Sequence, residues 1–373
     1  MADEQVPLLG PDNKDGDSGM AMLDNNGINR PASSSPPPPP APPTMPPATT
    51  STPIAIAHRG YKAQAPENTM LAFRRAVDVD AGAIETDLHL SRDGVVVLSH
   101  DADLGRCYGL PGVRVRDRDW AELAALRTAR APHEPMPRLR DLLAWLDEDP
   151  RAAGVGVLLD IKRHDDAEEL VRRTAETIAS VPATQRPWNE RITPCCWDAK
   201  YIRLCLAHLP GFRITHVGHS TAYARALVDQ VPGLSAVSML RHALAAPVTG
   251  PRFLRDMRAR GVPVHAWTVN EEDWMEWCVR NSIAGVITDD PALFREVRRR
   301  VGGKEEEEGK EGGMVRVRGM GMGEKRGVAR TLAKRAWFAF EMLLFHVLLA
   351  AFAGTTWLRH GSPRRRVREE LRG

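Results

Sequence analysis

The chain has few cysteines and little net charge, and both shortages limit what the protein can be. Its 373 residues include five cysteines and carry a formal net charge of +3. Because the cysteine number is odd and no Cys-x-x-Cys pair occurs, we expect reduced thiols rather than a disulfide framework or a thiolate metal centre. A nearly balanced charge gives no electrostatic reason to expect a nucleic-acid partner.

The N-terminus lacks the apolar core of a signal peptide. Residues 1–52 are instead rich in Pro, Ser, Asp, Asn and Gly, with a proline run from Pro36 to Pro40. Such a segment cannot bury enough apolar surface to offset the entropy lost on ordering, so we expect it to be disordered. The absent leader and the reduced thiols together predict a catalytic domain that faces the cytosol.

Two familiar signatures are also missing. No Gly-x-Gly-x-x-Gly turn follows the first strand candidate, which argues against a doubly wound nucleotide-binding sheet. No Gly-x-Ser-x-Gly elbow occurs either, so hydrolysis by a Ser/His/Asp triad has no support.

Residues 53–300 alternate between short β-branched runs and longer amphipathic stretches. Eight strands with intervening helices over this length predict an α/β fold, a (β/α)₈ TIM barrel, with an open doubly wound sheet as the rival. The strands are expected at 54–58, 84–88, 156–161, 191–196, 213–217, 235–239, 263–268 and 284–288.

The run 95–99 follows the strand at 84–88 too closely for a parallel crossover. The dipeptide Asp93-Gly94 lies between them and favours a hairpin turn. We therefore expect residues 84–99 to overshoot the barrel rim and fold back. Residues 102–150 carry two short helical patterns and no strand, so they are expected to form an inserted cap beside the barrel mouth.

The C-terminal part divides into a charged, Gly-rich linker (301–335), an apolar segment (336–358) and a basic tail (359–373). If helical, the apolar segment would span roughly 34 Å, enough for a bilayer core. Glu341 and His346 interrupt it, and basic residues flank both ends. We expect a membrane anchor, either a C-terminal membrane helix or a shallow interfacial segment; a helix packed on the barrel is the alternative.

Three carboxylates are candidates for holding a metal ion. Glu85 and Asp87 are two residues apart, so on a strand both point to the same face, and the apolar neighbours occupy the other. Asp160 ends the next strand in the same way. Carboxylates buried together repel one another, and a hard divalent cation such as Mg²⁺, Ca²⁺ or Mn²⁺ would relieve that cost.

Further polar residues lie at or just beyond the ends of strands. His58 and His100 can transfer protons, while Arg59 and Lys162 can bind a phosphate oxygen. Trp267 ends another strand, where it is either a core residue or part of a substrate wall. Glu67 and Asn68 each have two possible roles. Both could support the site residues; alternatively, Glu67 is structural and Asn68 caps a helix. This inventory suits metal-assisted cleavage of a phosphodiester.

With these residues in place, the chain resembles the glycerophosphodiester phosphodiesterase family, whose fold is a barrel of the PLC-like phosphodiesterase type. The resemblance covers about residues 53–300. The matching pieces are His58-Arg59-Gly60, PENT at 66–69, Glu85-x-Asp87, Asp93-Gly94 leading to His100-Asp101, Asp160-Ile161-Lys162, WTVN at 267–270 and GVITDDP at 285–291.

Within that family, the chain is most similar to the fungal phosphatidylglycerol phospholipase C branch. The shared features are HRGYKAQAPENT, LLDIK, WNERIT at 188–193 and an apolar C-terminal tail. The resemblance implies that His58 and His100 form the acid/base pair and that Arg59 and Lys162 bind phosphate. It also implies that Glu85 and Asp87 bind the metal. Asp160 stands where the wider family usually has Glu, which leaves the identity of the metal open.

The sequence therefore predicts a membrane-anchored hydrolase that cleaves phosphatidylglycerol into diacylglycerol and glycerol 3-phosphate. Its expected partners are a phospholipid substrate and a membrane. A second hypothesis is hydrolysis of soluble glycerophosphodiesters or lysophospholipids, which need no anchor. A third is a membrane scaffold that has lost catalysis, although the complete set of polar residues argues against it.

Overall fold

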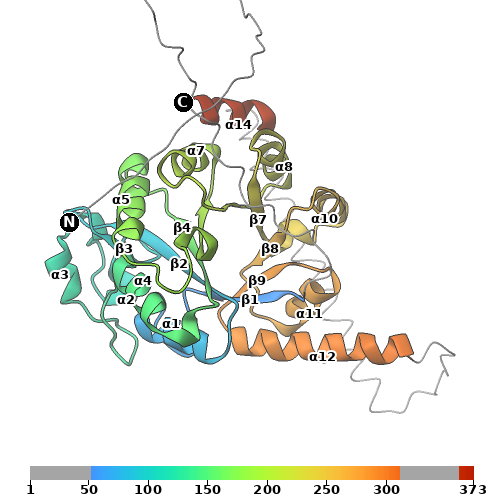
Figure 1. Ribbon diagram of the computed structural model, residues 1–373, viewed down its shortest axis with the longest axis horizontal. Helices are drawn as coiled ribbons and strands as arrows, with labels where there is room; N and C mark the ends of the chain where they lie inside the picture. The colour runs from blue at the N-terminus through green and yellow to red at the C-terminus, as the bar shows by residue number, and fades with distance from the viewer. Residues whose placement is uncertain (1–51, 311–360) are drawn as a thin grey trace, which may run out of the picture. The chain divides into compact units, whose positions relative to one another are not determined.

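Eight parallel strands close into a barrel, as the alternating pattern predicts (Figure 1). The computed structural model describes residues 52–310 and 361–373, except for the side chains of residues 303–310. Strand β1 pairs with both β9 and β2, so the sheet is closed and the doubly wound alternative is wrong. The barrel strands are β1 (Ile54–His58), β2 (Ala83–Leu90), β4 (Gly156–Ile161), β5 (Ile192–Cys196), β6 (Ile214–Gly218), β7 (Leu234–Leu240), β8 (Val264–Trp267) and β9 (Gly285–Thr288).

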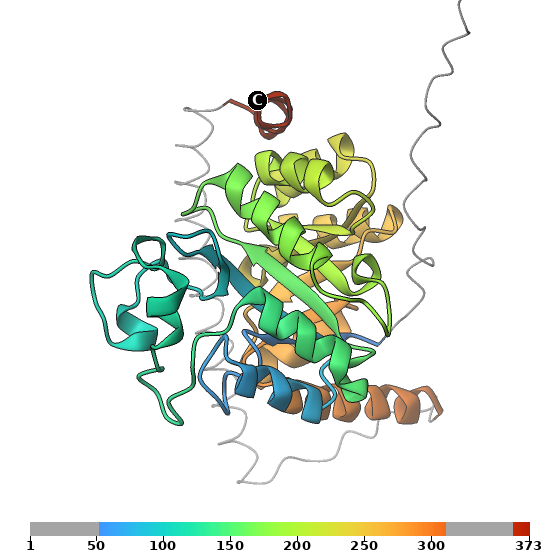
Figure 2. The same ribbon diagram turned by 60° about the vertical axis from the view of Figure 1, so that its left-hand side comes forward.

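Amphipathic helices surround the barrel (Figures 1 and 2). In α5, for example, the side chain of Asp166 accepts a hydrogen bond from the Glu169 backbone N–H at 2.9 Å and so caps the helix. Leu170 and Ile178 lie on its buried face. The helices of this layer are α1 (Met70–Asp78), α4 (Leu139–Glu148), α5 (Ala167–Ala179), α6 (Trp188–Arg191), α7 (Ala199–His208), α8 (Thr221–Gln230), α9 (Arg241–Leu244), α10 (Thr249–Ala259), α11 (Glu272–Arg280) and α12 (Pro291–Lys310).

The apolar core has two main layers. A large cluster fills the space between the strands and the helices. A smaller cluster takes one residue from each of six strands and packs against Trp197 and Trp267. Its members are Ile56, Ala83, Leu158, Cys195, Val217 and Ile287. Because four of these six residues also line a pocket, the inner layer forms the floor of the barrel mouth.

The predicted hairpin is confirmed. Strand β2 continues beyond its parallel neighbour and pairs antiparallel with β3 (Val96–Leu98). The turn requires the left-handed backbone of Gly94, whose φ is +78°. The chain that leaves β3 returns to the mouth, where His100 lines the same pocket as Glu85 and Asp87.

The expected cap is shorter than 102–150. Three short helices, α2 (Gly105–Tyr108), η1 (Val115–Asp117) and α3 (Trp120–Ala124), surround a small apolar cluster of their own. Helix α4, in contrast, buries its leucines in the main barrel core. The end of the expected cap is therefore wrong, because a regular barrel helix follows it.

The C-terminal boundaries also differ from the expectation. Helix α12 continues to Lys310, into the segment expected to be a linker. Within the expected basic tail, α14 (Pro363–Arg372) packs against α7 and α8 and buries Val367 completely. The N-terminal tail before residue 52 and the apolar segment 336–358 lie outside the described residues. Within the described ranges, no helix has the length and apolar character needed to cross a bilayer.

Candidate active site

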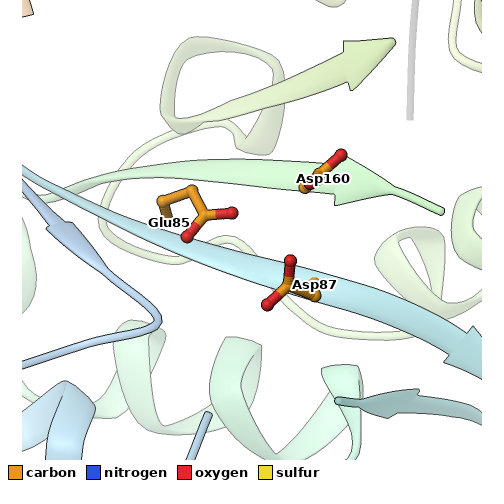
Figure 3. A group of neighbouring side chains, drawn as sticks. All are labelled: Glu85, Asp87 and Asp160. Carbon is orange, nitrogen blue, oxygen red and sulfur yellow. The ribbon is translucent and has the colours of Figure 1, made fainter. Parts of the chain in front are cut away.

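Three buried carboxylates meet where β2 and β4 run side by side (Figure 3). Glu85 and Asp87 share a face of β2, and the parallel register places Asp160 of β4 directly beside Asp87. One oxygen from each residue lies within 4.8 Å of the others. All three side chains belong to buried residues. The structure therefore brings the predicted metal ligands together.

The charges of this carboxylate cluster are only partly balanced. Burial, followed by repulsion from Asp87 and Asp160, raises the pKa of Glu85 well above its usual value. Burial would also raise the pKa of Asp87, but the nearby cations Lys162 and Arg59 outweigh that effect and lower it. Lys162 Nζ lies 2.7 Å from Asp87 Oδ1 and 2.6 Å from Asp160 Oδ2. Glu85 is thus the carboxylate with the least compensation.

The cluster fits a hard divalent cation. It offers three oxygen donors that are buried and close together, and oxygen ligands are what Mg²⁺, Ca²⁺ and Mn²⁺ prefer. Lys162 and Arg59 supply two positive charges to the three carboxylates, so ionised Glu85 leaves one negative charge for a cation to offset. When bound, the cation would offset negative charge on a phosphate oxygen and lower the pKa of a coordinated hydroxyl.

Each of the two predicted catalytic histidines is oriented by a carboxylate. His58 Nδ1 lies 2.5 Å from Asp289 Oδ1, and His100 Nδ1 lies 2.7 Å from Asp101 Oδ1. A carboxylate on Nδ1 holds the proton there and leaves Nε2 available for proton transfer. Burial lowers the pKa of both histidines, which favours the neutral rings.

Arg59 has an unusual backbone as well as a central position. Its φ is +56°, and its backbone N–H donates to Glu85 Oε2 at 3.0 Å. Its guanidinium donates to Glu67 at 2.8 Å, and its Nε lies 3.3 Å from Asp87 Oδ2. Gly60 follows with φ +80°, and a Cβ there would lie 2.7 Å from Ala72. The tight turn after β1 thus aims the guanidinium at the cluster.

Asn68 contributes to the cluster rather than to a helix cap. Its Nδ2 donates to Asp87 Oδ2 at 2.8 Å, and its Oδ1 accepts from the Thr86 hydroxyl at 2.7 Å. The N-cap of α1 is Thr69, so the capping alternative for Asn68 is wrong. Glu67 binds Arg59 and Arg106. Burial would raise its pKa, but these two arginines lower it to about 2.

Two tryptophans form the apolar side of the pocket. Trp267 Nε1 donates to the Ser238 backbone carbonyl at 3.0 Å, and the Trp267 ring meets Trp197 edge to face with centroids 5.7 Å apart. Trp197 Nε1 donates to Asp160 Oδ1 at 2.7 Å. The pocket has a volume of about 130 Å³ and is lined by the histidines, Arg59, the carboxylates, Lys162 and this apolar wall. Trp267 lines the pocket and also packs against the inner core cluster, so its position agrees with both predicted roles.

Comparison with known protein families identifies the family of this chain. The glycerophosphoryl diester phosphodiesterase family matches residues 58–293. The chain belongs to this family. It is a phosphoric diester hydrolase, as the sequence predicts.

The relatives of this phosphodiesterase span bacteria and animals. It is 31% identical to the probable glycerophosphodiester phosphodiesterase 2 of Mycobacterium tuberculosis, over 65% of this chain and 90% of the relative. It is 37% identical to glycerophosphodiester phosphodiesterase 1 of Bos taurus, over 63% of this chain and 77% of the relative. The fold matches an Oleispira antarctica phosphodiesterase solved with sn-glycerol-3-phosphate, with a TM-score of 0.57, 21% identity, and coverage of 66% and 96%.

Membership of the family bears on the metal. The family depends on a divalent metal, and among the described residues of this phosphodiesterase the buried carboxylate cluster could bind one. This agrees with the predicted cofactor class.

Several residues of the site were not predicted. Asp289 follows β9 directly, and Trp197 follows β5 directly, so each lies where strand ends meet the mouth. The rule that located Glu85 and Asp160 could have located them. Arg106 binds both Glu67 and Asp101, and nothing in its local sequence marks that role.

Proposed function

We propose that this phosphodiesterase hydrolyses glycerophosphodiesters by binding their phosphoglycerol half in the pocket and releasing glycerol 3-phosphate. The observation that carries the proposal is one pocket that joins a carboxylate cluster, two oriented histidines and two cations to an apolar wall. The names of the relatives support the same substrate class.

The size of the pocket supports a small bound group. A volume of about 130 Å³ is well below the roughly 300–1,000 Å³ of pockets that enclose drug-sized ligands. Phosphoglycerol is small enough to enter, whereas two acyl chains must stay outside.

The proposed roles follow from this placement. Glu85, Asp87 and Asp160 hold the cation, and Arg59 and Lys162 bind the phosphate. Both cations already contact carboxylates, so an arriving phosphate exchanges with or joins those contacts. Of His58 and His100, one removes a proton from the attacking hydroxyl through Nε2 and the other protonates the leaving alkoxide.

The attacking group that we propose is the free 2-hydroxyl of the bound glycerol. It is tethered to the phosphate, which gives it the large effective concentration of an intramolecular nucleophile. Attack would form a cyclic glycerol phosphate and release the alcohol, and water would then open the ring. Substrates without this hydroxyl should therefore react poorly.

Phosphatidylglycerol is the second candidate substrate. Its headgroup presents the same phosphoglycerol, and the apolar segment 336–358 with its basic flanks favours a substrate in a membrane. Helix α14 contacts α7 and α8, so the chain returns to the barrel after that segment. A single membrane crossing would separate α14 from the barrel. If the segment anchors the enzyme to a cytosolic leaflet, we propose an interfacial anchor that enters and leaves on one side.

A substrate panel tests these two candidates. We would incubate the full-length protein with glycerophosphocholine, phosphatidylglycerol vesicles and phosphatidylcholine vesicles, and identify the products by mass. Release of glycerol 3-phosphate from glycerophosphocholine supports the first candidate. Diacylglycerol formed from phosphatidylglycerol alone supports the second. Equal cleavage of phosphatidylcholine, or no cleavage of any substrate, would contradict the proposal.

The anchor is tested separately by replacing Leu343, Leu344, Val347, Leu348 and Leu349 with serine. This change leaves the sequences of α14 and of the barrel unaltered. Loss of vesicle binding in a flotation assay, with unchanged turnover of glycerophosphocholine, is the expected result. Unchanged flotation would exclude the anchor.

A further inference from the structure

The C-terminal helix α14 connects the end of the chain to the rim of the active site. It runs along α8 in the opposite direction. Arg364, near its start, binds Asp229 near the end of α8, while Glu370, near its end, reaches Tyr223 in the first turn of α8. The amino ends of barrel helices follow the carboxyl ends of the strands. Glu370 is thereby placed at the catalytic side of the barrel.

Glu370 makes its contacts with the start of α7. Its Oε2 accepts a hydrogen bond from the Ala199 backbone N–H at 3.2 Å and another from the Tyr223 hydroxyl. The same Ala199 N–H lies 3.0 Å from the Tyr223 oxygen. Arg366 holds the other carboxylate oxygen at 2.7 Å, and its guanidinium lies 4.9 Å from the centre of the Tyr223 ring. These contacts fix the carboxylate at the first residue of α7.

Ala199 is two residues from a side chain of the active site. Trp197 donates a hydrogen bond to Asp160 Oδ1 at 2.7 Å, and Asp198 between them caps α7. The segment 197–199 is therefore held at one end by the carboxylate cluster and at the other by Glu370. A shift at the start of α7 would displace the indole N–H from Asp160.

We propose that Glu370 is a positioning residue for the metal site: it fixes the start of α7, and thereby holds Trp197 in place to orient Asp160. The inference rests on the proposed role of Asp160 as a metal ligand. Groups that orient a ligand of a metal set its affinity as well as its geometry. Part of the affinity for the cation is thus determined by the last helix of the chain.

The chain supplies a matched control beside Glu370. Glu369 has the same charge, lies on the same helix and is exposed; its side chain bonds Arg365 of α14 at 2.7 Å. Glu369→Ala removes the same groups from α14 as Glu370→Ala. A difference between the two variants therefore reports the contact with α7.

The experiment measures Mn²⁺ binding to the chelator-stripped, full-length protein by isothermal titration calorimetry. Glu370→Ala should weaken binding about threefold to tenfold, less than the roughly 10–100-fold typical when a direct partner of a ligand is removed. Glu370→Gln keeps an acceptor oxygen and should retain most of the affinity. Glu369→Ala should bind Mn²⁺ as the wild type does.

A double variant tests whether Glu370 acts through Trp197. Trp197→Phe removes the indole N–H, so adding Glu370→Ala should weaken Mn²⁺ binding no further. If Glu370→Ala does not fold, Tyr223→Phe, which removes one donor to the carboxylate, should weaken binding in the same direction.

Two results would overturn the inference. One is wild-type Mn²⁺ affinity in Glu370→Ala with only a lower melting temperature, which would make the contact purely structural. The other is independent, additive loss in the double variant. If the carboxylate cluster is not the metal site at all, a different result is expected: Mn²⁺ would bind equally well to the wild type and to Glu85→Ala.

Discussion

Asp289 is the residue whose substitution tests the site most sharply. Its Oδ1 lies 2.5 Å from His58 Nδ1, while its Oδ2 lies 3.1 Å from Asn270 Nδ2 and 3.3 Å from Lys62 Nζ. Each carboxylate oxygen of Asp289 therefore has its own donors: His58 on one side, and Asn270 and Lys62 on the other. Asparagine has one acceptor oxygen, so in Asp289→Asn one side must lose its acceptor.

The tautomer of His58 then decides the size of the effect. Two donors, Asn270 and Lys62, favour the amide oxygen on their side, which turns the amide NH₂ toward His58. The amide NH₂ is a donor, so it selects the His58 tautomer with an unprotonated Nδ1 and a proton on Nε2. In that tautomer Nε2 cannot accept a proton from the substrate. Loss of a charged hydrogen bond, worth about 1.5–3 kcal/mol, corresponds to a roughly 10- to 150-fold lower kcat. An imposed wrong tautomer can cost up to roughly 10⁴-fold.

This reasoning predicts an unusual order of activities. Asp289→Ala removes the acceptor without imposing a tautomer, so it should be at least as active as the isosteric Asp289→Asn. The measurement is kcat for glycerophosphocholine across pH, with circular dichroism to verify folding. Burial is the main cause of the low pKa of His58, and Asp289 opposes it. Without Asp289 that pKa falls further, so the limb of the pH–rate profile that reports His58 should move to lower pH. Wild-type kcat in Asp289→Asn would refute the proposed orientation of His58.

Other consequences can be measured with the same substrate. His58→Ala and His100→Ala should each lower kcat by at least roughly 10²-fold with little change in folding; a near-normal kcat would return that histidine to a structural role. Excess chelator should abolish activity and Mg²⁺, Ca²⁺ or Mn²⁺ should restore it, because the cluster has only oxygen donors. Because the pKa of Glu85 is raised in the metal-free cluster, Mn²⁺ binding should release a proton, and the affinity should increase as pH rises toward that pKa. Calorimetry in two buffers measures the proton release, and an affinity that does not change with pH would contradict the prediction. A 2-deoxy analogue of glycerophosphocholine should bind but resist cleavage; equal turnover of that analogue would exclude the cyclic route.

The barrel and its carboxylates were predictable because their signals are local. Each strand is a short apolar run, and the spacing of Glu85 and Asp87 alone places both on one face. Asp93-Gly94 marks the hairpin that returns His100 to the mouth, and the antiparallel pairing of β2 with β3 confirms it. In a closed parallel barrel, residues at strand ends converge without further information.

The contacts between distant segments were not predictable in the same way. His58 and Asp289 are 231 residues apart, and only closure of the barrel between β1 and β9 brings them together. Lys162 was expected to be available for phosphate, yet it lies between two carboxylates. Its partners depend on side-chain directions at the crowded end of two strands, which a residue pattern does not specify.

The docking of α14 changes how truncations of this protein should be interpreted. The pattern of strands suggests that the barrel is complete by about residue 300, so removal of residues 336–373 would be expected to affect only an anchor. That truncation also removes Val367, which is fully buried, and Glu370, which contacts the start of α7. It uncovers an apolar surface on α7 and α8 and frees the segment that carries Trp197. Lower activity of the truncated protein on membranes would therefore not demonstrate an anchor. Serine substitutions within 336–358 separate the two effects, because they leave α14 in place.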